Sequence, residues 1–256
     1  MIRSIAIIVS LASLLGGTSC RTVLDPDSGI AKDGRVAAGI PSWSIQYEGS
    51  IVRRGKDYHI VDLFDVSDRD LSALKADGTR VIAYFSSQYE DWRPDANQFP
   101  ESDLGNNLDN WKGERWVNTR SMSIRNIMLA RLDYAKRRGF YGVDVDNVDI
   151  YEFRTGFAND RKEAAEYVRF LSREAHRRGL KFGLKNATDL IPSVRRSIDY
   201  YVNEQCHQYN EAGVYAGLRK PVFNIEYRPL KQGTRGIYTI YKQGAVMDGR
   251  EIVVAP

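Results

Sequence analysis

The stretch Gly142-Val143-Asp144-Val145-Asp146-Asn147-Val148-Asp149-Ile150-Tyr151 decides the fold that this sequence predicts. Its first half alternates apolar and acidic residues, as a β-strand does, and valines favour strands. Three carboxyl groups and one amide then fall within six residues. Like charges at this density repel one another and are costly to bury. The stretch is therefore either a solvated acidic loop or the end of a strand that delivers carboxylates to a functional site.

Three later runs favour the second interpretation, because each is strand-like and ends in polar or acidic residues. They are Gly183-Leu184-Lys185-Asn186, Tyr201-Val202-Asn203-Glu204-Gln205 and Val222-Phe223-Asn224-Ile225-Glu226-Tyr227. Earlier in the chain, strands are predicted over Trp43–Tyr47, His59–Phe64 and Arg80–Phe85. Parallel strands that bring polar residues to one end form the mouth of a TIM barrel. We expect the strand ends at Asp62, Tyr84, Asp146, Lys185, Glu204 and Glu226 to meet at one face.

Two helix-to-strand units have the pattern that a parallel α/β fold requires. One apolar stripe comprises Ile124, Ile127, Met128, Leu132 and Ala135, and the other comprises Ala164, Tyr167, Val168, Leu171 and Ala175. Each stripe ends in cations followed by Gly139 or Gly179, as expected at the negative end of a helix dipole. His176 lies in the second of these helix ends, so we interpret it as a helix-end residue rather than a catalyst.

The segment between the third strand and the first of these helices shows no periodicity over about 30 residues, from Ser86 to Trp116. It contains both aromatic and charged residues. Connectors of this length are uncommon in compact domains and are usually functional.

The chain of 256 residues suits one α/β barrel in a single domain. The net charge of +4 is too small to indicate a nucleic-acid partner, and no basic block is interleaved with aromatic residues. His59, His176 and His207 lack metal-ligand spacing, and Val148 and Asp149 break the pattern of a calcium loop. The sequence therefore predicts neither a metal nor a cofactor.

The first 20 residues have the pattern of an export signal. Arg3 precedes the apolar run Ile5–Leu15, and small residues lead to Cys20. We predict a signal peptide over residues 1–19, a flexible tether over 20–36 and a barrel domain over 37–256. The ending resembles a lipoprotein signal, although Gly17 stands where such signals usually carry Leu, so plain secretion stays open. Lipidation of Cys20 would be the protein's link to the membrane. Cys206 is then a small buried residue, and no disulfide framework is expected.

These motifs together resemble those of glycoside hydrolase family 114, the endo-α-1,4-polygalactosaminidase-like TIM barrels. The resemblance covers about residues 40–228. It rests on Asp146-Asn147-Val148-Asp149, Gly183-Leu184-Lys185-Asn186, Asn203-Glu204-Gln205-Cys206, Trp92-Arg93-Pro94-Asp95-Ala96, Trp111-x-Gly113-Glu114-x-Trp116 and Ile225-Glu226-Tyr227. It implies a (β/α)8 barrel that acts on α-1,4-linked galactosamine polymers, with Asp146 and Glu204 as the catalytic pair.

The chemistry agrees with that implication, since glycoside hydrolysis needs one protonated and one ionised carboxyl. Crowding by nearby aspartates is expected to raise the pKa of one partner. Acidic and aromatic side chains also suit an amino-sugar polymer. The candidates for substrate binding are Asp62, Tyr84, Asp144, Asn147, Asp149, Lys185, Asn186, Gln205, Glu226 and Tyr227.

Several of these candidates also have a purely structural interpretation. Asp144 would bond the backbone at the barrel rim, Lys185 would balance the aspartates, and Glu226 would anchor a strand end. The chain also departs from the family pattern. Asp144-Val145 replaces Glu-Pro, Ala212 stands where Cys206 usually has a partner, and His207 replaces an aromatic residue. The chain is dissimilar after Tyr227, which predicts a reduced or irregular last βα unit. A non-catalytic carbohydrate-binding envelope lipoprotein on the same barrel is the alternative function.

Overall fold

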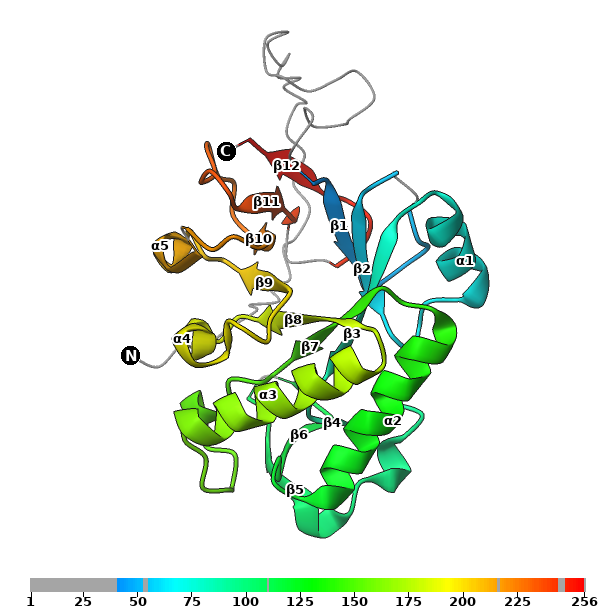
Figure 1. Cartoon of the computed structure of the whole chain (residues 1–256), viewed down its shortest axis with the longest axis vertical. Coiled ribbons are helices and arrows are strands. Elements are labelled where there is room, and N and C mark those ends of the chain that lie inside the picture. The colour runs from blue at the N-terminus through cyan, green and yellow to red at the C-terminus, as the bar shows by residue number, and fades with distance from the viewer. Residues whose placement is uncertain (1–40, 53–54, 110, 216, 244–246, 256) are drawn as a thin grey trace, which may run out of the picture.

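The computed structural model describes residues 41–52, 55–109, 111–215, 217–243 and 247–255. Within them, eight parallel strands form one curled sheet (Figure 1). They are β1 (Trp43–Gln46), β2 (Tyr58–Asp62), β3 (Arg80–Ser86), β7 (Gly142–Asp146), β8 (Lys181–Lys185), β9 (Tyr200–Glu204), β10 (Val222–Glu226) and β11 (Tyr238–Tyr241). Each pairs with the next in this order. The predicted α/β TIM barrel is confirmed.

The last unit of the barrel is irregular, as the sequence predicts. The described part of the chain holds no α-helix after β10, and β12 (Ile252–Val254) pairs antiparallel with β11. The segment before β12 contacts the two residues that follow β1, where the Met247 carbonyl accepts from the backbone N–H groups of Tyr47 and Glu48 at 2.8 and 3.0 Å. The Trp43 indole N–H donates to the Tyr238 carbonyl at 2.8 Å.

Three long helices pack on the outside of the sheet (Figure 1). They are α1 (Asp68–Ala76), α2 (Met122–Arg138) and α3 (Arg161–Arg177), and every residue of the two predicted apolar stripes is buried. Gly139 caps α2 with φ 76°, which explains the glycine there. Shorter turns are α4 (Ile191–Val194), α5 (Ala212–Tyr215) and the 3₁₀ helices Ala96–Gln98, Glu101–Asp103, Ile150–Glu152 and Thr188–Leu190.

Side-chain alternation along the strands separates two cores. Ile60, Ile82, Val202 and Ile225 belong to an apolar cluster contributed by alternate residues of the sheet strands, which places it inside the barrel. The second core lies between the sheet and the helices. The same alternation directs five polar side chains into the barrel toward the carboxyl ends of the strands: Asp144, Asp146, Lys185, Glu204 and Tyr227.

The long segment after β3 forms a small sheet of its own, which the sequence analysis missed. Strands β4 (Tyr89–Glu90), β6 (Glu114–Val117) and β5 (Leu104–Asn107) pair antiparallel, in the order β4-β6-β5. The buried Arg131 of α2 holds this insertion against the barrel. Its guanidinium donates to both carboxylate oxygens of Asp95, at 2.8 and 2.9 Å, and to the Ser86 carbonyl at 2.7 Å. The acidic and aromatic side chains of the insertion are thereby placed beside the strand ends.

Candidate active site

A cavity of about 830 Å³ opens at the carboxyl ends of the parallel strands. Strand ends of a parallel barrel meet at one face, so residues distant in sequence converge there. The structure brings nine of the predicted site residues to this cavity: Asp62, Tyr84, Asp146, Asn147, Asp149, Lys185, Asn186, Glu204 and Tyr227.

Lys185 lies at the centre of the predicted catalytic group. Its Nζ is 3.8 Å from Asp146 Oδ2, 3.8 Å from Glu204 Oε2 and 3.9 Å from Asp144 Oδ2, and its side chain is 1% exposed. The two cavity carboxylates are therefore separated by at most twice 3.8 Å at these oxygens. That span fits the separations of about 5 to 9.5 Å between paired carboxyls of glycosidases. Burial acts to lower the pKa of Lys185, but the surrounding carboxylates, Asp146 foremost, hold it above the usual value.

Asp146 is fixed by two donors from different elements. The Tyr84 hydroxyl of β3 donates to Asp146 Oδ2 at 2.9 Å, and the Asn147 backbone N–H donates to Oδ1 at 2.9 Å. Tyr47 stacks on Tyr84 with ring centroids 4.0 Å apart. Both carboxylate oxygens of Asp146 thus accept hydrogen bonds, which fix its orientation at the cavity.

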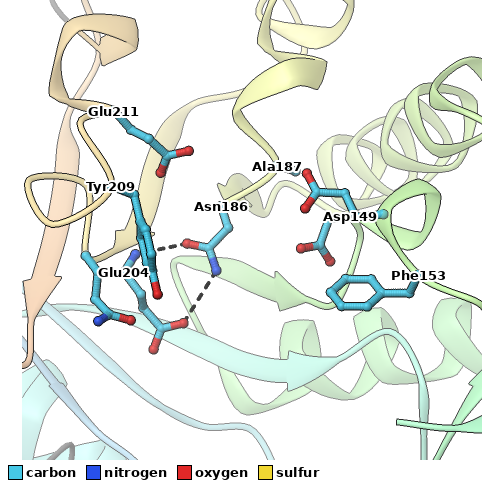
Figure 2. A pocket seen from close by; sticks show the side chains of 9 residues that line it. Asp149, Phe153, Asn186, Ala187, Glu204, Tyr209 and Glu211 are labelled. Carbon is cyan, nitrogen blue, oxygen red and sulfur yellow. Dashed lines mark hydrogen bonds between the residues drawn. The ribbon is translucent and has the colours of Figure 1, made fainter. Parts of the chain in front are cut away.

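Glu204, at the end of β9, is held by residues that follow the neighbouring strands on both sides, β8 and β10. Figure 2 shows the Asn186 amide turned toward Glu204, where its Oδ1 accepts from the Glu204 backbone N–H at 2.9 Å and its Nδ2 donates to Oε2 at 3.4 Å. The Tyr227 hydroxyl donates to Glu204 Oε1. Asn186 therefore fixes both the backbone and the carboxylate of Glu204.

The residue after each of three strand ends has a left-handed backbone. Asn147, Asn186 and Gln205 have φ of 58°, 46° and 65° and directly follow Asp146, Lys185 and Glu204. Asn tolerates this region better than most residues, whereas Gln rarely adopts it. Such strain costs roughly 1 to 3 kcal/mol per residue and tends to cluster at functional sites. Here it turns the chain sharply after each inward-pointing strand-end side chain.

Asp144 lies below the cavity rather than in it. It is fully buried, and neither carboxylate oxygen has a hydrogen-bond partner, so the interpretation that it bonds the backbone at the rim is wrong. Burial raises its pKa to about 7, while Lys185 opposes the rise. Asp144 therefore interacts electrostatically with Lys185 from the interior of the barrel, without contacting the cavity.

Two other candidates lie outside the main cavity. Gln205 lines a small side recess next to it, shared with Asn186 and Glu204. Glu226 is buried on the outward side of β10, where its Oε1 accepts from the His207 backbone N–H at 2.9 Å and from Asn224 Nδ2 at 3.1 Å. The geometry thus favours the strand-anchoring interpretation of Glu226.

The insertion adds acidic and aromatic residues to the cavity that were not predicted from the sequence as site residues. Arg93 donates to both carboxylate oxygens of Asp62, at 3.0 and 2.7 Å, and to Glu90 at 2.9 Å. Glu114, Trp92 and Trp111 also line the cavity. The signal was present in the two tryptophan-containing motifs, but the pairing of their strands was not recognisable from the sequence.

Glu114 gives a testable dependence of stability on pH. Its pKa is raised to about 8, first by burial and then by the charges of Glu90 and Asp146. Because the folded state then holds a proton that the unfolded state releases, stability falls as pH rises from about 4.5 to 8. Glu114→Gln should raise Tm by several degrees at pH 9 and leave it nearly unchanged at pH 4. Thermal melts of both proteins at the two pH values check this, and an equal shift at both would contradict it.

Cys206 and His176 have the structural surroundings that the sequence predicts. Cys206 is free and buried, and burial raises the pKa of its thiol. His176 lies in the last turn of α3, with its Nε2 2.7 Å from Asp199 Oδ2, at the opposite end of the strands from the cavity. Among the described residues, the one group that brings three possible metal-ligand atoms within 4.8 Å of one another comprises Cys206, His207 and Glu226. Its members already hydrogen-bond one another.

None of the helices in the described ranges is long and apolar enough to cross a membrane. The predicted signal peptide, the tether up to residue 36 and Cys20 lie outside the described residues.

Comparison with known proteins agrees with the geometry. The model of glycoside-hydrolase family GH114 matches residues 30–254. An uncharacterised protein of Deinococcus radiodurans is 25% identical over 223 residues, which cover 79% of this chain and 72% of the relative.

Two solved structures share the fold. Aspergillus fumigatus Ega3, solved in complex with galactosamine, is 36% identical, with a TM-score of 0.77 over 83% of this chain and 94% of the Ega3 chain. The glycoside hydrolase domain of Pseudomonas aeruginosa PelA is 16% identical and supports the fold alone, with a TM-score of 0.69 over 84% and 99% of the two chains. The resemblance predicted from the motifs is confirmed. The chain belongs to glycoside-hydrolase family GH114.

Proposed function

We propose that this protein is an endo-acting glycosidase that cleaves α-1,4-linked galactosamine-containing polysaccharide, with Asp146 and Glu204 as its catalytic carboxyls. The observation that carries the proposal is the position of these two carboxylates, on separate strands, on either side of Lys185 in one open cavity. A glycosidic bond placed between them would meet one carboxyl on each side.

Both carboxyls accept hydrogen bonds at both oxygens, but one donor to Asp146 is a backbone N–H whereas both donors to Glu204 are side chains. On this difference we assign the two carboxyls different roles. Asp146 accepts from Tyr84 and from the Asn147 backbone, which stabilises a carboxylate that acts as nucleophile or general base. Glu204 is then the general acid that protonates the leaving oxygen. Lys185 Nζ lies 3.8 Å from both carboxyls and offsets their negative charge. The attraction to this cation reduces the electrostatic cost of placing two carboxyls close together.

The chemistry of the cavity supports a cationic amino sugar. Asp62, Asp65, Glu90, Glu114 and Asp149 line it together with the catalytic pair, and they outnumber the lining cations. An ammonium group is attracted to such a site, and exposed aromatic faces stack on sugar rings or cations. The galactosamine complex of Ega3, a relative at 36% identity, points to the same sugar.

Incubation of the chain from residue 21 onward with galactosamine-rich exopolysaccharide tests the proposal. The expected products are oligosaccharides of several lengths from the earliest times, because an endo-acting enzyme cuts within the chain. Release of monosaccharide alone would contradict endo action, and an unchanged polymer would contradict the activity.

The alternative of a non-catalytic carbohydrate-binding lipoprotein predicts that the carboxyl pair has decayed or lies closed off. Both Asp146 and Glu204 line the open cavity and retain their hydrogen-bond donors, which favours the hydrolase. No observation specifically favours the alternative.

We also propose export, with lipidation at Cys20. Arg3, the apolar run Ile5–Leu15 and the small residues before Cys20 support it. Mass spectrometry of the mature protein should find a chain that begins at a diacylglyceryl-modified Cys20. An unlipidated chain cleaved nearby would indicate plain secretion, and a chain that retains Ile5–Leu15 would contradict both forms of export.

A further inference from the structure

A second pair of carboxyls lines the cavity on the insertion after β3. Glu90 of β4 and Glu114 of β6 are direct partners in the antiparallel β4–β6 register, and they are only 3% and 7% exposed. Like charges placed directly opposite each other destabilise a sheet. Their burial therefore needs a compensating interaction.

The interactions within the protein compensate Glu90 but not Glu114. The Arg93 Nε donates to Glu90 Oε2 at 2.9 Å. The same guanidinium also donates hydrogen bonds to Asp62 and, at 3.4 Å, to Asp65. The Glu114 carboxyl, in contrast, makes no hydrogen bond or ion pair with any residue that the structure describes, although the residue is more than nine-tenths buried and lines the cavity. An unpaired carboxyl that lines a cavity is left to interact there with water or with a ligand.

The surroundings of Glu114 favour a cation. Glu90 from β4 and Asp146 from β7 both raise its pKa, after burial, and Arg93 opposes them. The Tyr84 hydroxyl of β3, whose pKa is raised by burial and, among other charges, by Glu114, is uncharged at neutral pH and adds no charge. Glu114 therefore holds a proton at neutral pH unless a cation balances its charge. A bound cation would displace that proton.

Aromatic side chains on the same insertion identify what kind of cation fits. Trp92 and Trp111 line the cavity and are 53% and 46% exposed, although large aromatic side chains are usually buried. Exposed tryptophan side chains that share a cavity with a carboxylate suit a group that joins an apolar ring face to an ammonium. A de-N-acetylated hexosamine unit has both features.

We propose that Glu114, with its cross-strand partner Glu90 and with Trp92 and Trp111 in the same cavity, forms a subsite that binds the ammonium group of a hexosamine unit next to the unit held at Asp146 and Glu204. The cavity volume of about 830 Å³ is in the range of sites that enclose ligands larger than one monosaccharide. The proposal rests on the proposed function, because it assumes an amino-sugar polymer. It adds that the insertion selects free amines over N-acetylated units, which carry no charge.

Calorimetric titration with a defined α-1,4-galactosamine oligosaccharide and its fully N-acetylated counterpart tests the subsite. The titrations use Glu204→Gln protein, so that hydrolysis does not interfere. Adding Glu114→Gln should weaken binding of the free amine about ten- to a hundredfold, as expected for loss of a hydrogen bond to a charged group, and leave binding of the acetylated oligosaccharide unchanged. Glu166→Gln, on the exposed face of α3, is the matched control and should change neither.

A proton count distinguishes direct contact from a structural role. At pH 6, titrations in buffers of different ionisation enthalpy should show that protein with Glu114 releases about one proton more, on binding the free amine, than Glu114→Gln protein. Equal affinities, or an equal number of protons, would overturn the subsite.

The outcomes for the subsite and for the proposed function are separable. If wild-type protein cleaves the polymer while Glu114→Gln leaves affinity and proton release unchanged, the subsite fails and the function stands. If wild-type protein cleaves nothing while Glu114→Gln abolishes the binding preference, the function fails and the subsite stands. Absence of any binding to the free-amine oligosaccharide overturns the subsite.

Discussion

Asp146→Asn and Glu204→Gln are each expected to reduce cleavage of a galactosamine-rich polymer by at least a factor of about 10² to 10⁴. General acid–base assistance alone is worth this much, and loss of a covalent nucleophile can cost more. Both substitutions keep the size and the hydrogen-bonding shape of the side chain while removing its charge. Initial rates of oligosaccharide release, with Glu166→Gln as the matched control on α3, measure the effect.

Stability measurements make this result interpretable. Tm of either variant should stay close to that of wild type, because the amide oxygen still accepts from one donor and the amide N–H can donate to the tyrosine hydroxyl at the other position. A variant that loses activity and unfolds at lower temperature would report on folding rather than on chemistry. Full activity in both variants would remove the pair from the mechanism and direct attention to other carboxyls that line the cavity, such as Asp149 and Glu114.

A substrate with an activated leaving group separates the two roles. Such a leaving group needs no protonation, so its first-step rate should recover in Glu204→Gln but not in Asp146→Asn. The opposite pattern would exchange the acid and the nucleophile. Equal rescue of both would contradict a mechanism in which only one carboxyl protonates the leaving oxygen.

The barrel could be predicted from the sequence because its signals are local. The valine-aspartate alternation before Asn147 and the glycine after each apolar helix stripe specify where strands and helices end. The carboxyl ends of parallel strands lie on one face of the barrel, so the convergence of Asp146, Lys185 and Glu204 follows from the topology.

The insertion could not be predicted, because its structure depends on contacts distant in sequence. Strand β4 has two residues and leaves no periodicity to detect. Its position is set by β6, about 25 residues away, and by Arg131, which lies on α2 and bonds Asp95. The Glu90–Glu114 pair exists only through that register. Similarly, the sequence predicts Glu226 as a strand-end carboxylate of the site. Side chains alternate along β10, however, so Glu226 points outward and Tyr227, the next residue, points into the cavity.

Lys185→Met is expected to have the largest effect on stability, because it removes the cation that three carboxylates share. The Lys185 side chain is 1% exposed, and Asp144 beneath it has no hydrogen-bond partner to replace it. Removing one partner of a buried ion pair typically costs about 3 to 5 kcal/mol in the free energy of unfolding. Urea denaturation at pH 8 should show a loss of this size, together with loss of cleavage.

The loss should also depend on pH and on Asp144. The pKa of Asp144 is raised to about 7 even beside Lys185, so its destabilising charge is present above that pH and disappears as pH falls below it. Without Lys185 the pKa of Asp144 rises further, and denaturation at pH 5 should show a smaller loss than at pH 8. Adding Asp144→Asn to Lys185→Met should recover stability at pH 8 without restoring cleavage, because Asp146 and Glu204 still lack their shared cation. Equal losses at both pH values, or no recovery in the double variant, would show that Lys185 stabilises the barrel by packing rather than by charge.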